Sequence, residues 1–160
     1  MRDGGLALLG EDPIPDHASS VIETAFHSPV LLLRWRVRCE PSDVQRIRIA
    51  IENAYRKHGG PIVYVASIPE DVPTPDADTR NALRAGAQEA TTRCASLHLV
   101  IEGEGLRRSI IRNVAAAMML ATGGSFAIHT HPIKALAAAS KTTPFDVEDV
   151  FAQGREFGLF

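Results

Sequence analysis

The sequence predicts one α/β domain, built on a single mixed sheet of about five strands with four to five helices. Two observations predict this fold class. From about residue 30 onward, short runs of β-type residues alternate with amphipathic helical stretches. The chain has 160 residues, 45% of them hydrophobic, which is enough for one core and too little for two. The net charge of -2 provides no overall field for nucleic acid, so we expect no nucleic-acid partner.

The beginning of the chain shows no targeting signal. Residues 1–20 are dominated by glycine, proline and acidic side chains, which predicts a flexible leader. The apolar run from Leu6 to Leu9 is too short for an export signal, and no run approaches the ~18 residues that span a bilayer. Cys39 and Cys94 have no CxxC spacing, which is typical of reduced thiols. Together these features predict a cytoplasmic protein with no membrane span.

Two strands joined by a short turn are predicted at the start of the domain, over residues 21–26 and 30–38. In the second strand Arg34, Arg36 and Arg38 alternate with apolar residues. Because successive side chains of a strand point to opposite faces, this alternation predicts one solvent-exposed face that carries three guanidinium groups. The interspersed acids and the few aromatic residues favour a solvated surface over a nucleic-acid site.

The next elements alternate between helix and buried strand. A helix is predicted to begin at Ser42 as its N-cap and to end before Gly59, which can adopt the left-handed conformation. The nearly continuous apolar run 61–68 predicts a central strand covered on both faces. On the following helix, 76–93, a narrow stripe of mostly small residues should allow close approach to the sheet. This stripe consists of Leu83, Gly86, Ala87 and Ala90.

The remainder of the chain continues the same alternation. The predicted elements are a strand at 96–102, a helix at 106–121, a strand at 125–129, and helices at 132–139 and 145–153. We therefore divide the chain into the leader, an α/β domain over residues 21–140, and a C-terminal segment over residues 141–160.

The order of these elements resembles the STAS family, the fold of anti-sigma-factor antagonists and of the cytoplasmic tails of sulfate transporters. The resemblance covers about residues 21–139. It implies a STAS-like, non-enzymatic regulatory domain of bacterial signalling that works by protein–protein contact. In antagonist members a phosphorylatable Ser or Thr follows an Asp where the helix after the third strand begins, and Asp78 and Thr79 occupy the matching positions. The alternative for this segment is that Asp76 or Asp78 caps the helix.

A second reading of the chain is a small enzyme or ligand-binding protein with its pocket at the carboxyl ends of the strands. The candidate ligand-binding residues are Ser67, Glu102, Gly103, Gly105 and His129, and Thr79 could join them. A strand-to-helix turn with two glycines can hold a phosphate through backbone N–H groups. The P-loop lysine is absent, however, which favours a tight turn.

Two histidines near the end of the last predicted strand raise the question of metal binding. His129 and His131 lie on the same side of a strand end and could bridge a metal ion, but no third ligand stands at a diagnostic spacing. No GxSxG elbow surrounds any serine. We expect no metal, no cofactor and no catalytic residue.

The C-terminal segment is rich in apolar side chains. Chain ends usually fray, so apolar residues there need a surface to cover. They either close the core of the domain itself or dock on a second subunit, and we expect a homodimer. These interface candidates are Phe145, Val150, Phe151, Phe157, Leu159 and Phe160.

Overall fold

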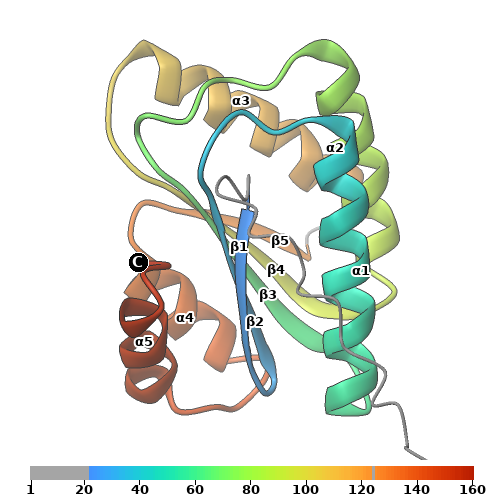
Figure 1. The fold of residues 1–160 in the computed structure, drawn as a ribbon, viewed down its shortest axis with the longest axis vertical. Helices are drawn as coiled ribbons and strands as arrows, with labels where there is room; N and C mark the ends of the chain where they lie inside the picture. Colours follow the sequence, from blue (N-terminus) through green and yellow to red (C-terminus); the bar gives the residue numbers. More distant parts are fainter. Residues whose placement is uncertain (1–21, 124) are drawn as a thin grey trace, which may run out of the picture.

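A five-stranded mixed sheet lies between two layers of helices in the computed structural model, which describes residues 22–123 and 125–160 (Figure 1). The predicted fold class, α/β with one mixed sheet, is confirmed. The predicted leader, residues 1–20, lies outside the described residues. None of the helices in the described part of the chain is long and apolar enough to cross a membrane.

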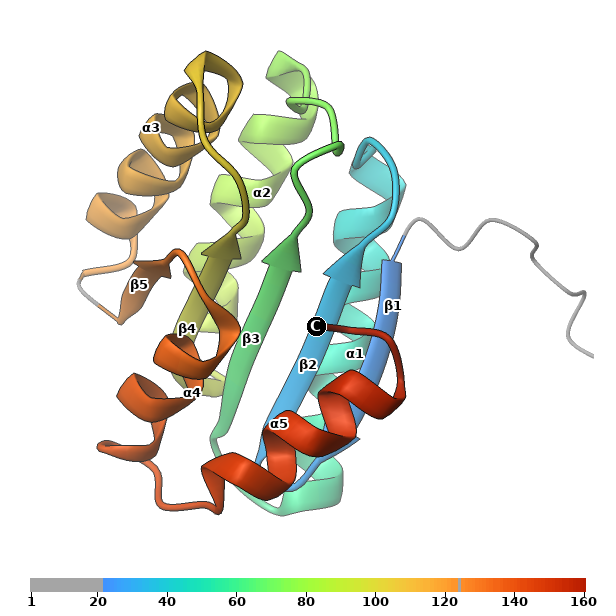
Figure 2. The same cartoon turned by 90° about the vertical axis from the view of Figure 1, so that its left-hand side faces the viewer.

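The strands lie in the sheet in the order of the sequence. Strand β1 pairs antiparallel with β2, and β2 to β5 are parallel. The three helices that connect the parallel strands, α1, α2 and α3, all cover one face, and α4 and α5 cover the other (Figure 2). The elements are β1 (Ile22–His27), β2 (Val30–Trp35), α1 (Pro41–His58), β3 (Ile62–Ile68), α2 (Ala77–Ala90), β4 (Cys94–Ile101), α3 (Leu106–Ala121), β5 (Phe126–His129), α4 (Pro132–Ser140) and α5 (Val147–Glu156).

Helix α1 begins two residues before the position that its sequence predicts. Its N-cap is Glu40, whose backbone N–H donates to Asp43 Oδ2 at 2.8 Å. Pro41 occupies the first helical position, where a missing N–H removes no helical hydrogen bond. Ser42 therefore lies inside the helix, and its prediction as N-cap is wrong. The predicted end is confirmed, since Gly59 has φ +81°.

The prediction of a solvent-exposed arginine face on the second strand is also wrong. Val30 and Leu32 lie on that face and are buried beneath the α4–α5 layer. Arg34 is mostly buried, with 16% of its side chain exposed. The strand ends before Arg36 and Arg38, which are exposed. A second helix layer covers this face of the strand as far as Arg34, and only Arg36 and Arg38, beyond the strand's end, are exposed as predicted.

The sheet separates two hydrophobic cores. In the central strand β3, Ile62 and Tyr64 belong to the core beneath α1–α3, whereas Val63 and Val65 belong to the core beneath α4 and α5. All four side chains are buried, as expected for a strand covered on both faces.

The C-terminal segment packs on the domain's own sheet. Val150 is 0% and Leu159 is 1% exposed, and both belong to the second core. Phe157 is 59% exposed. The aromatic side chains that are partly buried against this core are Phe145, Phe151 and Phe160. The apolar tail therefore closes the fold from which it emerges, and whether the chain forms a homodimer stays a prediction.

Candidate functional site

An apolar cavity of about 100 Å³ lies between the sheet and the layer formed by α1, α2 and α3. It reaches the carboxyl ends of β2 and β3, where the proline-rich loop before α2 contributes Val72 and Pro73 to its wall. An engineered apolar cavity of about 150 Å³ binds benzene, so a space of this order accommodates a small apolar molecule. The side chains that line it from the sheet are Trp35, Tyr64, Ile68, Leu97, Leu99 and Phe126.

The small residues of α2 explain why this space is left unfilled. Gly86, Ala87 and Ala90 line the cavity from α2, and Ala115 lines it from α3. The sequence predicts that such a stripe brings the helix close to the sheet. Ala90 belongs to the same core as the sheet residues of this face, and the short side chains of α2 leave part of the space beneath the helix unfilled. Filling this volume would matter energetically, because an unfilled cavity of this size is associated with about 2 kcal/mol of lost stability.

The wall of the cavity is electrically neutral except at one point. Of the described residues that line it, Arg48 alone is charged. Burial, reinforced by Asp43, raises the pKa of the Cys39 thiol well above its usual range, so this thiol is protonated at neutral pH. Burial likewise raises the pKa of Tyr64. Such a wall favours an apolar guest and contains no activated nucleophile.

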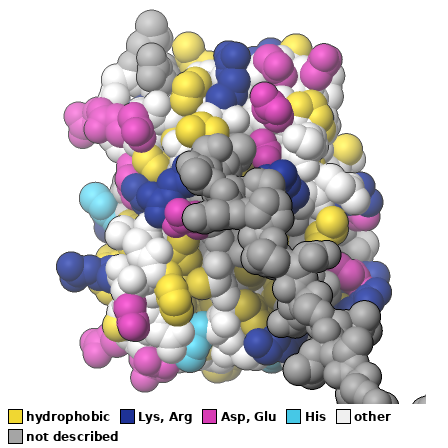
Figure 3. All heavy atoms as spheres, in the orientation of Figure 1, with side chains coloured by type: hydrophobic (Ala, Val, Ile, Leu, Met, Phe, Trp, Pro, Cys, Tyr) yellow, Lys and Arg dark blue, Asp and Glu magenta, His cyan; other side chains and the backbone are white. Residues whose placement is uncertain are grey.

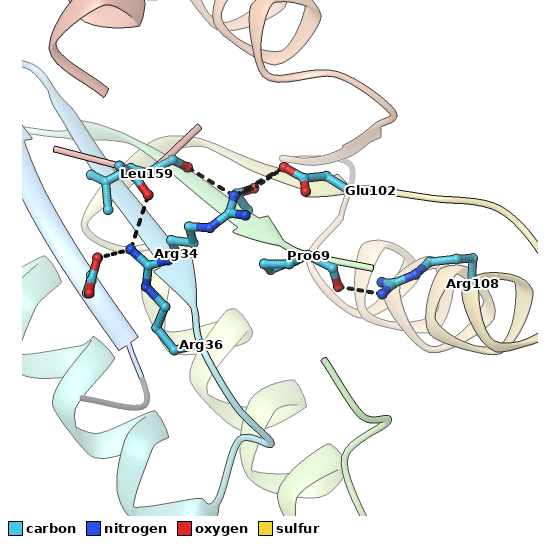
Figure 4. Close-up of polar contacts among 9 residues, drawn as sticks. Arg34, Arg36, Pro69, Glu102, Arg108 and Leu159 are labelled. Carbon is cyan, nitrogen blue, oxygen red and sulfur yellow. Dashed lines mark hydrogen bonds and ion pairs between the residues drawn. The ribbon is translucent and has the colours of Figure 1, made fainter. Parts of the chain in front are cut away.

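A polar cluster lies on the opposite face of the sheet and unites two of the predicted ligand-binding residues. Ser67 Oγ donates to Glu102 Oε1 at 3.2 Å, and Glu102 lies beside Arg34 (Figure 4). Arg34 Nη1 forms an ion pair with the same Glu102 oxygen at 3.2 Å and donates to the Leu159 carbonyl at 3.5 Å. Ser67 is fully buried, so its hydroxyl is not open to a dissolved substrate in this structure. The cluster holds the C-terminal segment against β2.

Arg36 adds a second tie to the C-terminal segment. It donates to the Gly158 carbonyl at 3.1 Å and pairs with Glu23 of β1. Figure 4 shows this arrangement beside the Arg34 contacts. The contact between Arg34 and the C-terminal segment could not be found from the sequence, because the acceptor Leu159 lies 125 residues away along the chain.

His129 lies apart from this cluster and pairs with another histidine. In the sheet register Ser67 is opposite Val100, which in turn is opposite His129, so about two strand spacings, ~10 Å, separate Ser67 from His129. His129 Nε2 is 3.0 Å from His98 Nδ1, and His98 Nε2 is 3.0 Å from Ser96 Oγ. Burial, with a contribution from His129, lowers the pKa of His98 to about 4, and burial also lowers the pKa of His129. Both imidazoles are therefore neutral at pH 7.

The Gly103 side of the Gly103–Gly105 turn is filled by protein groups. Both glycines have positive φ, +85° and +100°. A Cβ at Gly103 would lie 2.6 Å from side-chain atoms of Glu70, and the Gly103 carbonyl accepts from Arg112 Nη2 at 3.0 Å. A carboxylate pressed against the turn opposes a phosphate. The geometry thus agrees with a tight turn.

The start of α2 is capped by a carboxylate. Asp76 Oδ1 accepts from the Thr79 backbone N–H at 2.8 Å, and this hydrogen bond lowers the pKa of Asp76. Asp78 is exposed, whereas the Thr79 side chain is fully buried. A kinase could reach the Thr79 hydroxyl only after α2 had moved. Modification at Thr79 therefore stays a prediction, and the buried side chain does not favour it.

Several charged side chains on the described surface form ion pairs. Arg48 pairs with Glu89 at 2.6 Å, and Glu52 pairs with both Arg93 and Arg56. On the face drawn in Figure 3, acidic and basic side chains are interspersed. No group of three or more His, Cys, Asp or Glu in the described ranges is arranged to hold a metal ion, and His131 is exposed.

Comparison of the chain with protein-family models, curated proteins and solved structures found no match. The STAS resemblance, and the regulatory role that it implies, therefore stay predictions. The residues that sequence reasoning missed are those of the cavity beneath α2. The stripe Gly86, Ala87 and Ala90 was a visible signal for it, because small residues can mean either close packing or unfilled space.

Proposed function

We propose that the protein binds a small apolar molecule in the cavity beneath α2 and acts as a binding or sensing protein. The observation that carries this proposal is the cavity itself, about 100 Å³ of space with an almost wholly apolar wall. Well-packed interiors contain few voids larger than a water molecule. A ligand that enters a space of this size, which reaches the carboxyl ends of β2 and β3, would bury its apolar surface against an apolar wall.

A binding role fits this cavity better than catalysis. The thiol of Cys39 is kept protonated, and of the described residues in the wall Arg48 alone is charged. General acid–base or nucleophilic chemistry needs a titratable group near the operating pH. The polar cluster of Arg34, Ser67 and Glu102 lies on the other face of the sheet, where it binds the C-terminal segment.

A pair of substitutions in α2 tests the proposal. Ala87 is buried in the cavity wall, and Ala85 is exposed on the same helix. We expect Ala87→Leu to fill the space and weaken binding of 1-octanol at least tenfold, and Ala85→Leu to leave binding unchanged. Binding is measured by calorimetric titration. Trp35, the only tryptophan of the chain, lines the cavity and provides a fluorescence signal for the same titration.

The outcomes are separable. If neither 1-octanol nor other small apolar compounds bind the wild-type protein, the proposal fails. If they bind equally well to wild type and Ala87→Leu, the ligand site lies elsewhere and the cavity has no such function. A thermal melt of each variant shows whether it is folded before the titration is interpreted.

A further inference from the structure

A polar groove meets the apolar cavity between α1 and α2. The groove has a volume of about 240 Å³, and its lining includes Glu52 of α1, Glu89 of α2 and Arg93 of the turn that follows α2. The same residues line groove and cavity where the two meet: Arg48, Ile51, Gly86 and Ala90. Gly86 packs against α1 at this junction, since a Cβ there would lie 3.0 Å from Val44 Cγ1, so the Val44 side chain has to shift for a ligand to pass from one space to the other. With that shift, one ligand could occupy both spaces, with an apolar part inside and a polar part outside.

The two cations of the groove differ in how firmly they are held. Arg93 donates to Glu52 at 2.8 Å, and its guanidinium carbon lies 4.9 Å from the Tyr55 ring centroid. Glu52 also accepts from Arg56 at 2.9 Å. The hydrogen bond from Arg93 contributes most, and that from Arg56 next, to lowering the pKa of Glu52. Arg93 thus belongs to a network with Glu52 and Arg56 and also contacts the Tyr55 ring. Arg93 could bind a ligand only after these contacts had been broken.

Arg48 is the more exchangeable cation. It donates to Glu89 Oε1 at 2.6 Å and to Gln45 Oε1 at 2.9 Å. The side chains of Arg48 and Glu89 are 44% and 56% exposed. An ion pair this exposed contributes little to stability, because solvent screens both charges. A ligand carboxylate that is also anchored by its apolar chain could therefore replace Glu89 at Arg48.

We propose that the ligand is an amphipathic carboxylic acid, with its apolar chain in the cavity and its carboxylate bound to Arg48 in the groove between α1 and α2. This inference rests on the proposed function. A carboxylate matches the guanidinium in charge and in the geometry of its two oxygens. The carboxylates of Glu89 and Glu52 oppose it, so Glu89 has to turn outward toward solvent as the ligand binds. An amine head group is disfavoured because Arg48 lies where the two spaces meet.

The test compares octanoate with 1-octanol, which share a chain and differ in the charge of the head group. Both are titrated calorimetrically into the wild-type protein, Arg48→Gln and the control Arg56→Gln. Arg56 lies on the same helix, has 75% of its side chain exposed and lines neither space. We expect the wild-type protein to bind octanoate at least fivefold more tightly than 1-octanol. This preference should disappear in Arg48→Gln and persist in Arg56→Gln.

A second variant guards against a folding defect in Arg48→Gln. Glu89→Gln removes the competing carboxylate and leaves Arg48 in place, so it should bind octanoate more tightly than wild type does. The inference is overturned if the wild-type protein binds both compounds equally, or if the preference for octanoate survives in Arg48→Gln. In either case binding of 1-octanol still supports the proposed function. If neither compound binds, both proposals fail.

Discussion

At the scale of single residues, the histidine pair shows how burial sets the charge of a side chain. His98 is 5% exposed, and its two ring nitrogens are 3.0 Å from His129 Nε2 and from Ser96 Oγ. One polar atom lies beside each ring nitrogen, so the neutral imidazole can be satisfied there. A charged imidazolium would lose its hydration, which is why the pKa of His98 falls to about 4.

This shift predicts that acid destabilises the protein. An unfolded chain protonates this histidine near pH 6.5, whereas the folded protein resists protonation down to about pH 4. The unfolded state therefore binds more protons across this window, and the free energy of unfolding should fall by about 2 to 3 kcal/mol as pH drops from about 6.5 to about 4. Urea unfolding at a series of pH values measures this decrease.

Two variants make the acid experiment specific to His98. His98→Gln cannot titrate, so its stability should change less across this window than that of the wild-type protein. The exposed His131 provides the control, because His131→Gln should keep the wild-type slope. Equal slopes for wild type and His98→Gln would contradict the assignment.

At the scale of elements, α2 is the helix on which the proposed site depends. Its inward face is made of small residues that border the cavity, and its first turn is held by the Asp76 cap. Three residues connect its C-terminal end to β4. The loop that leads into α2 begins at Pro69, whose carbonyl accepts a hydrogen bond from the buried Arg108 of α3 (Figure 4). Contacts at its two ends and with α1 thus hold α2 over a space that its side chains do not fill.

Substituting either of two neighbouring aspartates tests whether Asp76 caps α2. Asp76→Ala removes the acceptor for the Thr79 backbone N–H and should lower the free energy of unfolding by about 1 kcal/mol. Asp78 lies in the same turn and is not the N-cap, so Asp78→Ala should have a smaller effect. Chemical denaturation measures both changes. If Asp78→Ala lowered the free energy of unfolding more than Asp76→Ala does, Asp76 would not be the N-cap of α2.

At the scale of the whole molecule, the C-terminal segment completes the second helix layer. Leu159 inserts into the core beneath α4 and α5, while Arg34 and Arg36 donate to the carbonyls of Leu159 and Gly158. Phe160 stacks on Phe151, with ring centroids 5.6 Å apart. Apolar and polar contacts therefore hold the last residues on the sheet, which leaves Phe157 as the exposed aromatic residue of the tail.

Two truncations distinguish a core role of the tail from an interface role. Leu159→Ala should lower the free energy of unfolding by about 3 kcal/mol, as for other buried leucines. Phe157→Ala, at an exposed position, should change it by less than about 0.5 kcal/mol. Both are measured by urea unfolding at two protein concentrations. A large loss for Phe157→Ala that depends on concentration would show instead that this residue contributes to a subunit contact.

Local patterns explain which parts of the fold were predictable. The apolar run of β3, the capping aspartate of α2 and the left-handed Gly59 each act within a few residues of themselves. The position of Glu40 as the cap of α1 was missed, since Pro41 and Ser42 both looked like starting residues. The meeting of Arg34 with Glu102 was missed as well, because it depends on how separate strands align.

The sequence by itself determined the α/β class, the order and approximate limits of its elements, and the burial of β3 on both faces, because hydrophobic periodicity acts along the chain. Only the tertiary structure decided that a second helix layer covers the arginine-bearing face of β2. It also decided that the small residues of α2 border a cavity. The physical reason is that the space beneath a helix depends on the summed side-chain volumes of several elements packed together, and no single segment of the sequence contains that sum.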